Sequence, residues 1–87
     1  MTAEALSEKY ISAMEKTVRD MQQTKGAITI NEACINELFG YVTAYLEDAK
    51  YFRDQKKFET SLTSIAYCEG LLDALKLIGA VKNPSTP

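Results

Sequence analysis

The chain has 87 residues, of which 46% are hydrophobic and 25% are charged, a composition typical of one small globular domain and not of a disordered segment. Its formal net charge of −2 lacks the basic excess with which nucleic-acid-binding domains contact phosphates. It has no histidine and only two cysteines, which excludes histidine-based triads, His–Cys zinc sites and tetrathiolate sites. We therefore predict a non-enzymatic protein with no catalytic residues, no metal and no cofactor.

The first predicted helix runs from about Ala3 to Thr24. Its apolar residues recur at steps of three and four and form one narrow stripe: Leu6, Tyr10, Met14, Val18 and Met21. The remaining positions are mostly polar, so this helix is expected to pack on one side only. Gly26 is the expected left-handed stop after it.

The second predicted helix runs from about Ile30 to Asp54. Thr29 and Glu32 have the spacing of a capping box, in which each side chain would accept a hydrogen bond from the other residue's backbone amide. The apolar residues of this helix cover about 160° of its circumference at 100° per residue. A face this wide is expected to contact two other helices.

The third predicted helix runs from about Lys57 to Ile78, after a turn over residues 54–57, and Gly79 is its expected C′ residue. Short connections make neighbouring helices antiparallel. The sequence thus predicts an all-α fold, an antiparallel up-down-up three-helix bundle formed by residues 1–82, followed by a flexible polar tail over residues 83–87.

Two helical segments carry a family resemblance. Residues 45–52 read Tyr-Leu-Glu-Asp-Ala-Lys-Tyr-Phe, and residues 66–74 read Ala-Tyr-Cys-Glu-Gly-Leu-Leu-Asp-Ala. In this order and spacing they resemble the archaeal domain of unknown function family 357, whose members are small helical bundles. The resemblance covers residues 38–79; it implies a three-helix bundle and an archaeal, cytosolic source, and it carries over no activity. The family turns through a Gly-Asp-Tyr-like segment where this chain has residues 55–58 without glycine, so the turn is expected to differ in length or type.

Both later helices also carry small residues and tyrosines outside their main apolar faces: Gly40, Ala44, Tyr51, Ala66, Tyr67, Gly70 and Ala74. In an antiparallel hairpin Gly40 lies level with Gly70. A glycine costs a helix interior about 1 kcal/mol relative to alanine, so something is expected to approach the backbone at this level. The sequence leaves open close packing within the bundle, a surface for self-association or another partner, and a small-molecule pocket.

Aromatic and sulfur side chains are expected to divide between packing and exposure. Tyr10, Tyr41 and Tyr45 fall on or beside the apolar stripes and are predicted to be packed rings with solvated hydroxyl groups, whereas Tyr51 and Tyr67 fall outside them, as is typical of interfaces. No secretory leader or apolar run of about 20 residues is present, so we expect a reducing cytoplasmic location. The two cysteines are then expected to pack as small hydrophobic side chains, with a disulfide or a reactive thiol as the alternative: Cys34 and Cys68.

Acidic residues within the apolar patterns are predicted to be structural. Asp48 and Asp73 are expected to accept hydrogen bonds from hydroxyl groups across the hairpin. About ten residues of helix, or some 15 Å, separate their levels, which is too far for a catalytic pair. Glu37 and Glu69 lie closer to Asp73; this acidic set is interpreted as a solvated face, with a site for a divalent cation as the alternative.

The hairpin tip carries the densest basic cluster: Lys50, Arg53, Lys56 and Lys57. A solvated helix end is the favoured interpretation, because cations complement the dipole of a last helical turn. The sequence as a whole predicts a helical interaction or accessory module that self-associates through the second and third helices, with a protein as partner and neither nucleic acid nor membrane. The alternative is a nucleotide- or RNA-binding accessory domain that uses this basic tip and stacking on Tyr51.

Overall fold

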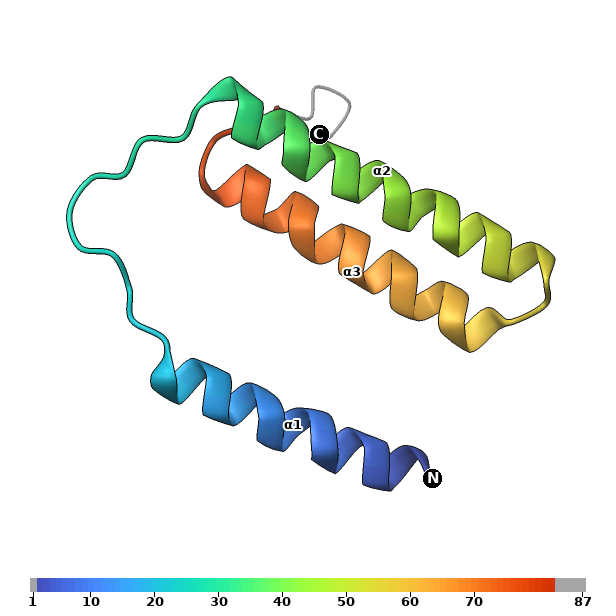
Figure 1. Cartoon of the computed structure of the whole chain (residues 1–87). Helices are drawn as coiled ribbons and strands as arrows, with labels where there is room; N and C mark the ends of the chain where they lie inside the picture. Colours follow the sequence, from blue (N-terminus) through green and yellow to red (C-terminus); the bar gives the residue numbers. More distant parts are fainter. Residues whose placement is uncertain (1, 83–87) are drawn as a thin grey trace.

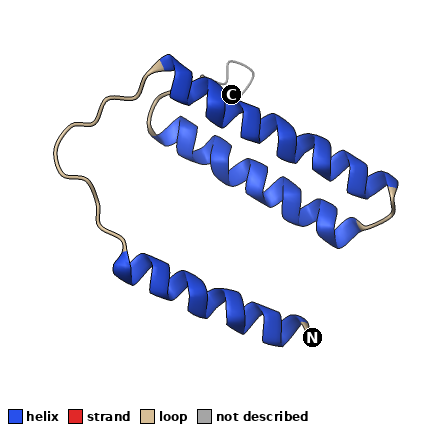
Figure 2. Ribbon diagram, viewed as in Figure 1, coloured by secondary structure: helices blue, strands red, loops and turns tan. Residues whose placement is uncertain are grey.

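The computed structural model describes residues 2–82 and contains three α-helices: α1 (Ala3–Asp20), α2 (Glu32–Asp54) and α3 (Phe58–Leu77). Within this part of the chain all regular structure is helical (Figure 2). The predicted all-α class and the three helices are confirmed. The predicted tail, residues 83–87, lies outside the described residues.

The antiparallel pair of α2 and α3, called here the hairpin, forms the core (Figure 1). Its buried residues lie along one seam between the two helices: Val42, Ala49, Cys68 and Leu75. Half-buried side chains extend the seam, among them Leu38, Tyr45, Leu71 and Leu72. The repeat of three and four residues in both helices turns these side chains to one side, which explains why this pair of helices packs.

Two hydrogen bonds set the register of the hairpin. The Ser61 hydroxyl donates to the Ala49 carbonyl over 2.7 Å, and the Cys68 thiol donates to the Val42 carbonyl over 3.6 Å. In both pairs the residue numbers add to 110, so Gly40 lies level with Gly70 as predicted. These small side chains also bring α3 close to the α2 backbone.

Each helix of the hairpin ends in a Schellman motif. At the tip, the Lys57 amide donates to the Phe52 carbonyl over 2.8 Å and the Lys56 amide to the Arg53 carbonyl over 2.9 Å. Lys56 therefore occupies the left-handed C′ position at φ +62°. The turn type that favours glycine is kept here without glycine. After α3, Gly79 holds the C′ position at φ +74°, as predicted.

Helix α2 begins two residues later than predicted. Its N-cap is Asn31, whose side-chain oxygen accepts a hydrogen bond from the Cys34 amide over 2.9 Å. The predicted capping box of Thr29 and Glu32 is wrong, because it needs a helix that begins at Ile30, whereas asparagine, the stronger N-cap residue of the two candidates, caps a helix that begins at Glu32.

Helix α1 is capped by Thr2, whose hydroxyl accepts a hydrogen bond from the Ala5 amide over 3.0 Å. It ends at Asp20, four residues before the predicted end, and Gly26 (φ +80°) lies in the following linker instead of stopping the helix. No α1 Cα atom lies within 8 Å of a Cα atom of the hairpin helices, so α1 has no packing partner among the described residues (Figure 1). The early end is consistent with this, since packing supplies most helix stability in proteins.

Candidate functional site

The level glycines of the hairpin do not mark close packing. A Cβ atom built at Gly40 or at Gly70 would meet nothing within 4 Å. At about 100° per residue, each glycine lies about 160° round its helix from the buried seam residue Val42 or Cys68. Both small-residue stripes therefore lie on the outer surface of the hairpin. Packing within the hairpin does not explain these small residues, because they lie on its exposed surface.

Tyrosines gather on one side of the seam. The rings of Tyr45 and Tyr67 lie 4.6 Å apart between centroids, across α2 and α3, and Tyr41 lies one turn from Tyr45. We call these three residues the tyrosine face. Tyr45 is half-buried, whereas Tyr67 and Tyr41 are 59% and 51% exposed. Ala74 lies about 20° round α3 from Tyr67, so one candidate small residue borders this face directly.

Of the five tyrosine predictions two are wrong and three are confirmed, among them the packed ring of the half-buried Tyr45. Tyr10 and Tyr41 are exposed instead of packed, because α1 has no partner and Tyr41 lies beyond the edge of the two-helix seam. Tyr51 and Tyr67 are exposed, as predicted. Tyr51 lies away from the tyrosine face, with its ring edge-on to Phe52 at 5.3 Å.

Acidic residues form no site in the described chain. Asp48 and Asp73 are exposed, and within residues 2–82 the predicted hydrogen bonds from hydroxyl groups to these carboxylates are absent. The nearby hydroxyl of Thr63 donates instead to the Glu59 carbonyl over 3.0 Å, one turn back in its own helix. No three cysteine or acidic side chains in this part of the chain gather closely enough to hold a metal ion.

The basic tip is partly neutralised. Lys50 pairs with Glu47 at 3.2 Å, and Arg53 pairs with Asp54 at 3.1 Å. Lys56 is engaged through its backbone in the turn, and the adjacent Lys57 is the N-cap of α3 without a side-chain cap hydrogen bond. The four cations thus surround the turn at the tip. Two of them, Lys56 and Lys57, hold backbone positions in that turn, and the other two form ion pairs.

The two cysteines differ in environment. Cys68 is buried in the seam, as predicted. Cys34 is exposed, so its predicted packing is wrong: it lies in the first turn of α2, one turn before the half-buried Leu38 at which the seam begins. Both thiols are unbridged.

A second apolar surface lies on the other side of the seam. It is a groove of about 210 Å³ between α2 and α3, lined by Leu46, Ala49, Lys50, Arg53, Ser61 and Ile65. We call it the aliphatic groove. Leu46 lies about 100° round α2 from Tyr45, so groove and tyrosine face flank the seam on opposite sides. The groove is not predicted from the sequence, although the 160° apolar face of α2 indicates apolar side chains on both flanks of the seam.

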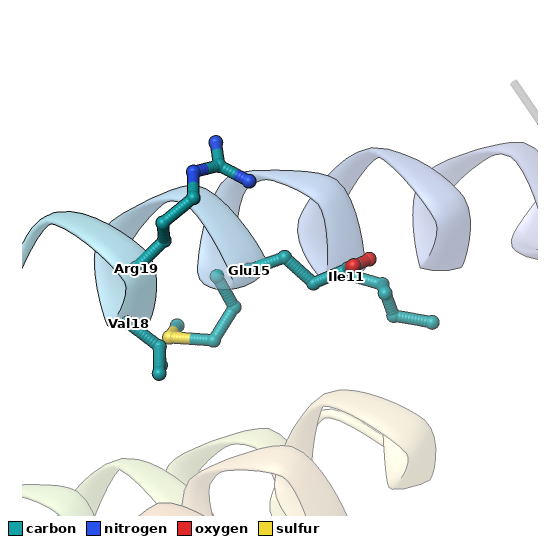
Figure 3. A pocket seen from close by; sticks show the side chains of 5 residues that line it. Ile11, Glu15, Val18 and Arg19 are labelled. Carbon is teal, nitrogen blue, oxygen red and sulfur yellow. The ribbon is translucent and has the colours of Figure 1, made fainter.

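The apolar stripe of α1 is also uncovered. The hollow along it is lined only by residues of α1 itself: Ile11, Met14, Glu15, Val18 and Arg19. In Figure 3, Ile11 and Val18 extend from the side of α1 toward the hairpin ribbons, and Arg19 extends to the opposite side. Val18 remains 65% exposed, which agrees with the absence of packing on this helix.

Comparison with known proteins identifies the family. The family model described as "Protein of unknown function (DUF357)" matches residues 9–81. The chain belongs to this family. No curated protein and no solved structure matches it. The DUF357 match includes most of α1 and the whole linker to α2, whereas the motifs seen in the sequence lie in the hairpin alone. No helix in residues 2–82 is both long and apolar enough to cross a membrane.

Proposed function

We propose that this DUF357 protein is a non-enzymatic helical interaction module of the cytoplasm that self-associates through α2 and α3. The tyrosine face carries the proposal. Tyrosine is enriched at protein interfaces because it offers a large apolar ring and a polar tip at a low cost in side-chain entropy. Here a pair of rings in contact, Tyr45 and Tyr67, tilted by 36° to one another, spans both helices and leaves Tyr67 more than half exposed.

The small residues beside the tyrosines fit the same role. Ala74 borders Tyr67, and Gly70 lies about 60° round α3 from Tyr67, with open space where its Cβ atom would be. Small side chains next to protruding aromatic rings offer a shallow surface into which the rings of a second copy fit. A two-fold interface of this kind is self-complementary, because each copy supplies both rings and recess.

Light scattering at micromolar concentration tests the proposal with the substitution Gly70→Leu. Gly70 lies in a helix and its Cβ would meet open space, so leucine fits and raises helix propensity by up to about 1 kcal/mol. The variant is expected to fold and to be monomeric, because the leucine fills the recess beside the tyrosine face.

Gly40→Leu is the matched control. Its Cβ atom also meets open space, but it lies about 100° round α2 from Tyr41, away from the tyrosine face. We expect a dimer for the unchanged chain and for Gly40→Leu. A strictly monomeric unchanged chain, or a dimer that persists in Gly70→Leu, would contradict the proposal.

The alternative role, nucleotide or RNA binding at the basic tip, has a different signature. Binding through phosphate contacts weakens steeply with ionic strength. Titration of a single-stranded RNA at low salt, with Lys57→Gln as the comparison, separates the two roles. Because two of the four cations already sit in ion pairs, we expect no detectable RNA binding.

A further inference from the structure

We infer that α1 is a strap that closes over its own hairpin, on the side of the seam that holds the aliphatic groove. The groove, near the tip, is only one end of a longer apolar surface. We call the whole surface the aliphatic flank: Phe39, Leu46, Ile65 and Leu72. All four lie about 40–60° round their helices from the buried seam residues, on the same side. Phe39 and Leu46 are 40% and 38% exposed, so this flank is uncovered as α1 is.

The apolar side chains of α1 and of the flank lie at the same levels. In Figure 1, α1 runs antiparallel to α2, and we place Asp20 level with Glu32 because they end and begin adjacent antiparallel helices. Leu6 is then level with Leu46 and, through the hairpin register, within about one residue of the level of Ile65. A second layer of matching side chains follows about two turns further along: Met14, Phe39 and Leu72. The stripe therefore covers the flank over its length and not the groove alone.

Opposite charges border the docked stripe and the flank. In the same register, three pairs come within about two residues, or about 3 Å, of one level: Glu4 with Lys50, Lys9 with Glu69, and Asp20 with Lys76. All six side chains are exposed. The ion pairs that Lys50 and Asp20 form within their own helices are exposed too, so they exchange at little cost.

The charges also choose between the two sides of the seam. On the aliphatic flank, the edge of α1 that carries Glu4 lies over α2, where Lys50 is. On the tyrosine face, the same edge would lie over α3 instead, beside the uncharged Thr60 and Thr63. The aliphatic flank is therefore the better match for α1, and closure leaves the tyrosine face free for a second copy.

The linker makes α1 of the same chain the occupant of the flank. Residues 21–31 reach about 36 Å when extended, whereas packed helices lie about 8–10 Å apart. A short flexible linker holds a tethered segment at a millimolar effective concentration, so at a micromolar chain concentration a chain's own α1 is favoured about a thousandfold over that of a second copy. The stripe also points toward the hairpin, as Ile11 and Val18 show in Figure 3. The linker is longer than the roughly two to eight residues usual between bundle helices, which lets the strap open as well as close.

A disulfide between α1 and α2 tests the closure in the full chain. Ser7 lies about 30° from the middle of the α1 stripe, and Thr43 lies one turn after Phe39 on the flank side of α2. Both are exposed, and in the docked register they lie within about two residues of one level. Ser7→Cys and Thr43→Cys are combined in one chain with Cys34→Ser, while Cys68 stays buried in the seam. Both new cysteines replace small polar side chains, so no apolar contact is lost.

Two matched controls each move one thiol to the wrong side. Ser12→Cys in place of Ser7→Cys puts it on the far side of α1, and Asp48→Cys in place of Thr43→Cys puts it on the tyrosine-face side of α2. After mild oxidation at micromolar concentration, a non-reducing gel is expected to show a fast-migrating monomer with an internal disulfide for the test chain. The yield of each control is expected to be at least about tenfold lower, because thiols on opposite sides cannot reach disulfide geometry.

Every other result overturns the inference. A covalent dimer as the main product means that a second copy supplies the helix. Equal yields in the test chain and the Ser12→Cys control, or no disulfide in any chain, mean that α1 does not dock. A higher yield with Asp48→Cys means that α1 covers the tyrosine face. Light scattering of the unmodified chain decides the proposed self-association separately, since a monomer there contradicts that proposal and leaves the closure to the gel.

Discussion

Lys56→Gly is expected to stabilise the hairpin by about 1 kcal/mol. Lys56 occupies the left-handed region at φ +62° because the Schellman motif at the tip requires that conformation. An L-residue with a Cβ atom pays about 1–2 kcal/mol there. Glycine removes this strain, but its greater conformational freedom in the unfolded chain lowers the free energy of unfolding by about 0.5–1 kcal/mol. The net gain of about 1 kcal/mol corresponds to a rise in Tm of about 4–8 °C for a domain of this size.

Urea and thermal unfolding followed by circular dichroism measure this gain. Lys56→Ala is the matched control, since it removes the same charge and keeps the Cβ atom, and its stability is expected to stay within about 0.5 kcal/mol of the unchanged chain. All chains are compared at one concentration, because self-association also raises Tm. Equal stabilities of the glycine and alanine variants would refute the reasoning, because the gain would then come from the charge and not from the backbone.

Three further predictions concern the core, the caps and the register. Leu75→Ala is expected to lower the free energy of unfolding by about 2–4 kcal/mol, because Leu75 is 1% exposed in the seam, whereas Leu77→Ala, at 87% exposed, changes it by less than about 0.5 kcal/mol in the same urea titration. Asn31→Ala is expected to lower the free energy of unfolding by about 1 kcal/mol through loss of the α2 cap, and Thr29→Ala is expected to have no measurable effect. If thermal unfolding gave the reverse order, the capping box of Thr29 and Glu32 would be the correct cap. Ser61→Ala is expected to cost about 1 kcal/mol, because the 2.7 Å hydrogen bond across the hairpin is lost; an unchanged urea midpoint would show that seam packing alone holds the register.

Helix positions and hairpin register follow from local signals in the sequence. The period of apolar residues predicts all three helices, and Gly79 marks the end of α3 because a left-handed C′ residue is easiest for glycine. The start of α2 is less predictable, since Thr29 and Asn31 both suit an N-cap and the stabilisation that threonine and asparagine give there differs, by our estimate, by only about a few tenths of a kcal/mol. The turn at Lys56 shows the same limit: the motif persists where its preferred residue is missing, because the seam on either side holds the two helices in place.

The candidate site is only partly readable from the sequence. Exposed Tyr67 and its small neighbours on α3 are predicted from their place outside the apolar stripe, and the structure brings Tyr67 onto Tyr45. Gly40 and Gly70 are at one level, as their spacing indicates, yet they face outward on separate helices. The level of a residue along the hairpin follows from its distance in sequence from the turn. The direction in which it points depends on which side of each helix packs in the seam.

The sequence by itself therefore determines an all-α chain of the DUF357 family, three amphipathic helices and an antiparallel pair with a defined register. The tertiary structure decides which apolar surfaces find a partner: the seam of α2 and α3 is closed, and the α1 stripe is not. The physical reason is that periodicity specifies which face of a helix is apolar, while the hydrophobic effect is non-directional and accepts any complementary surface. The packing of whole helices determines which surface that is, and here it leaves the apolar stripe of α1 exposed.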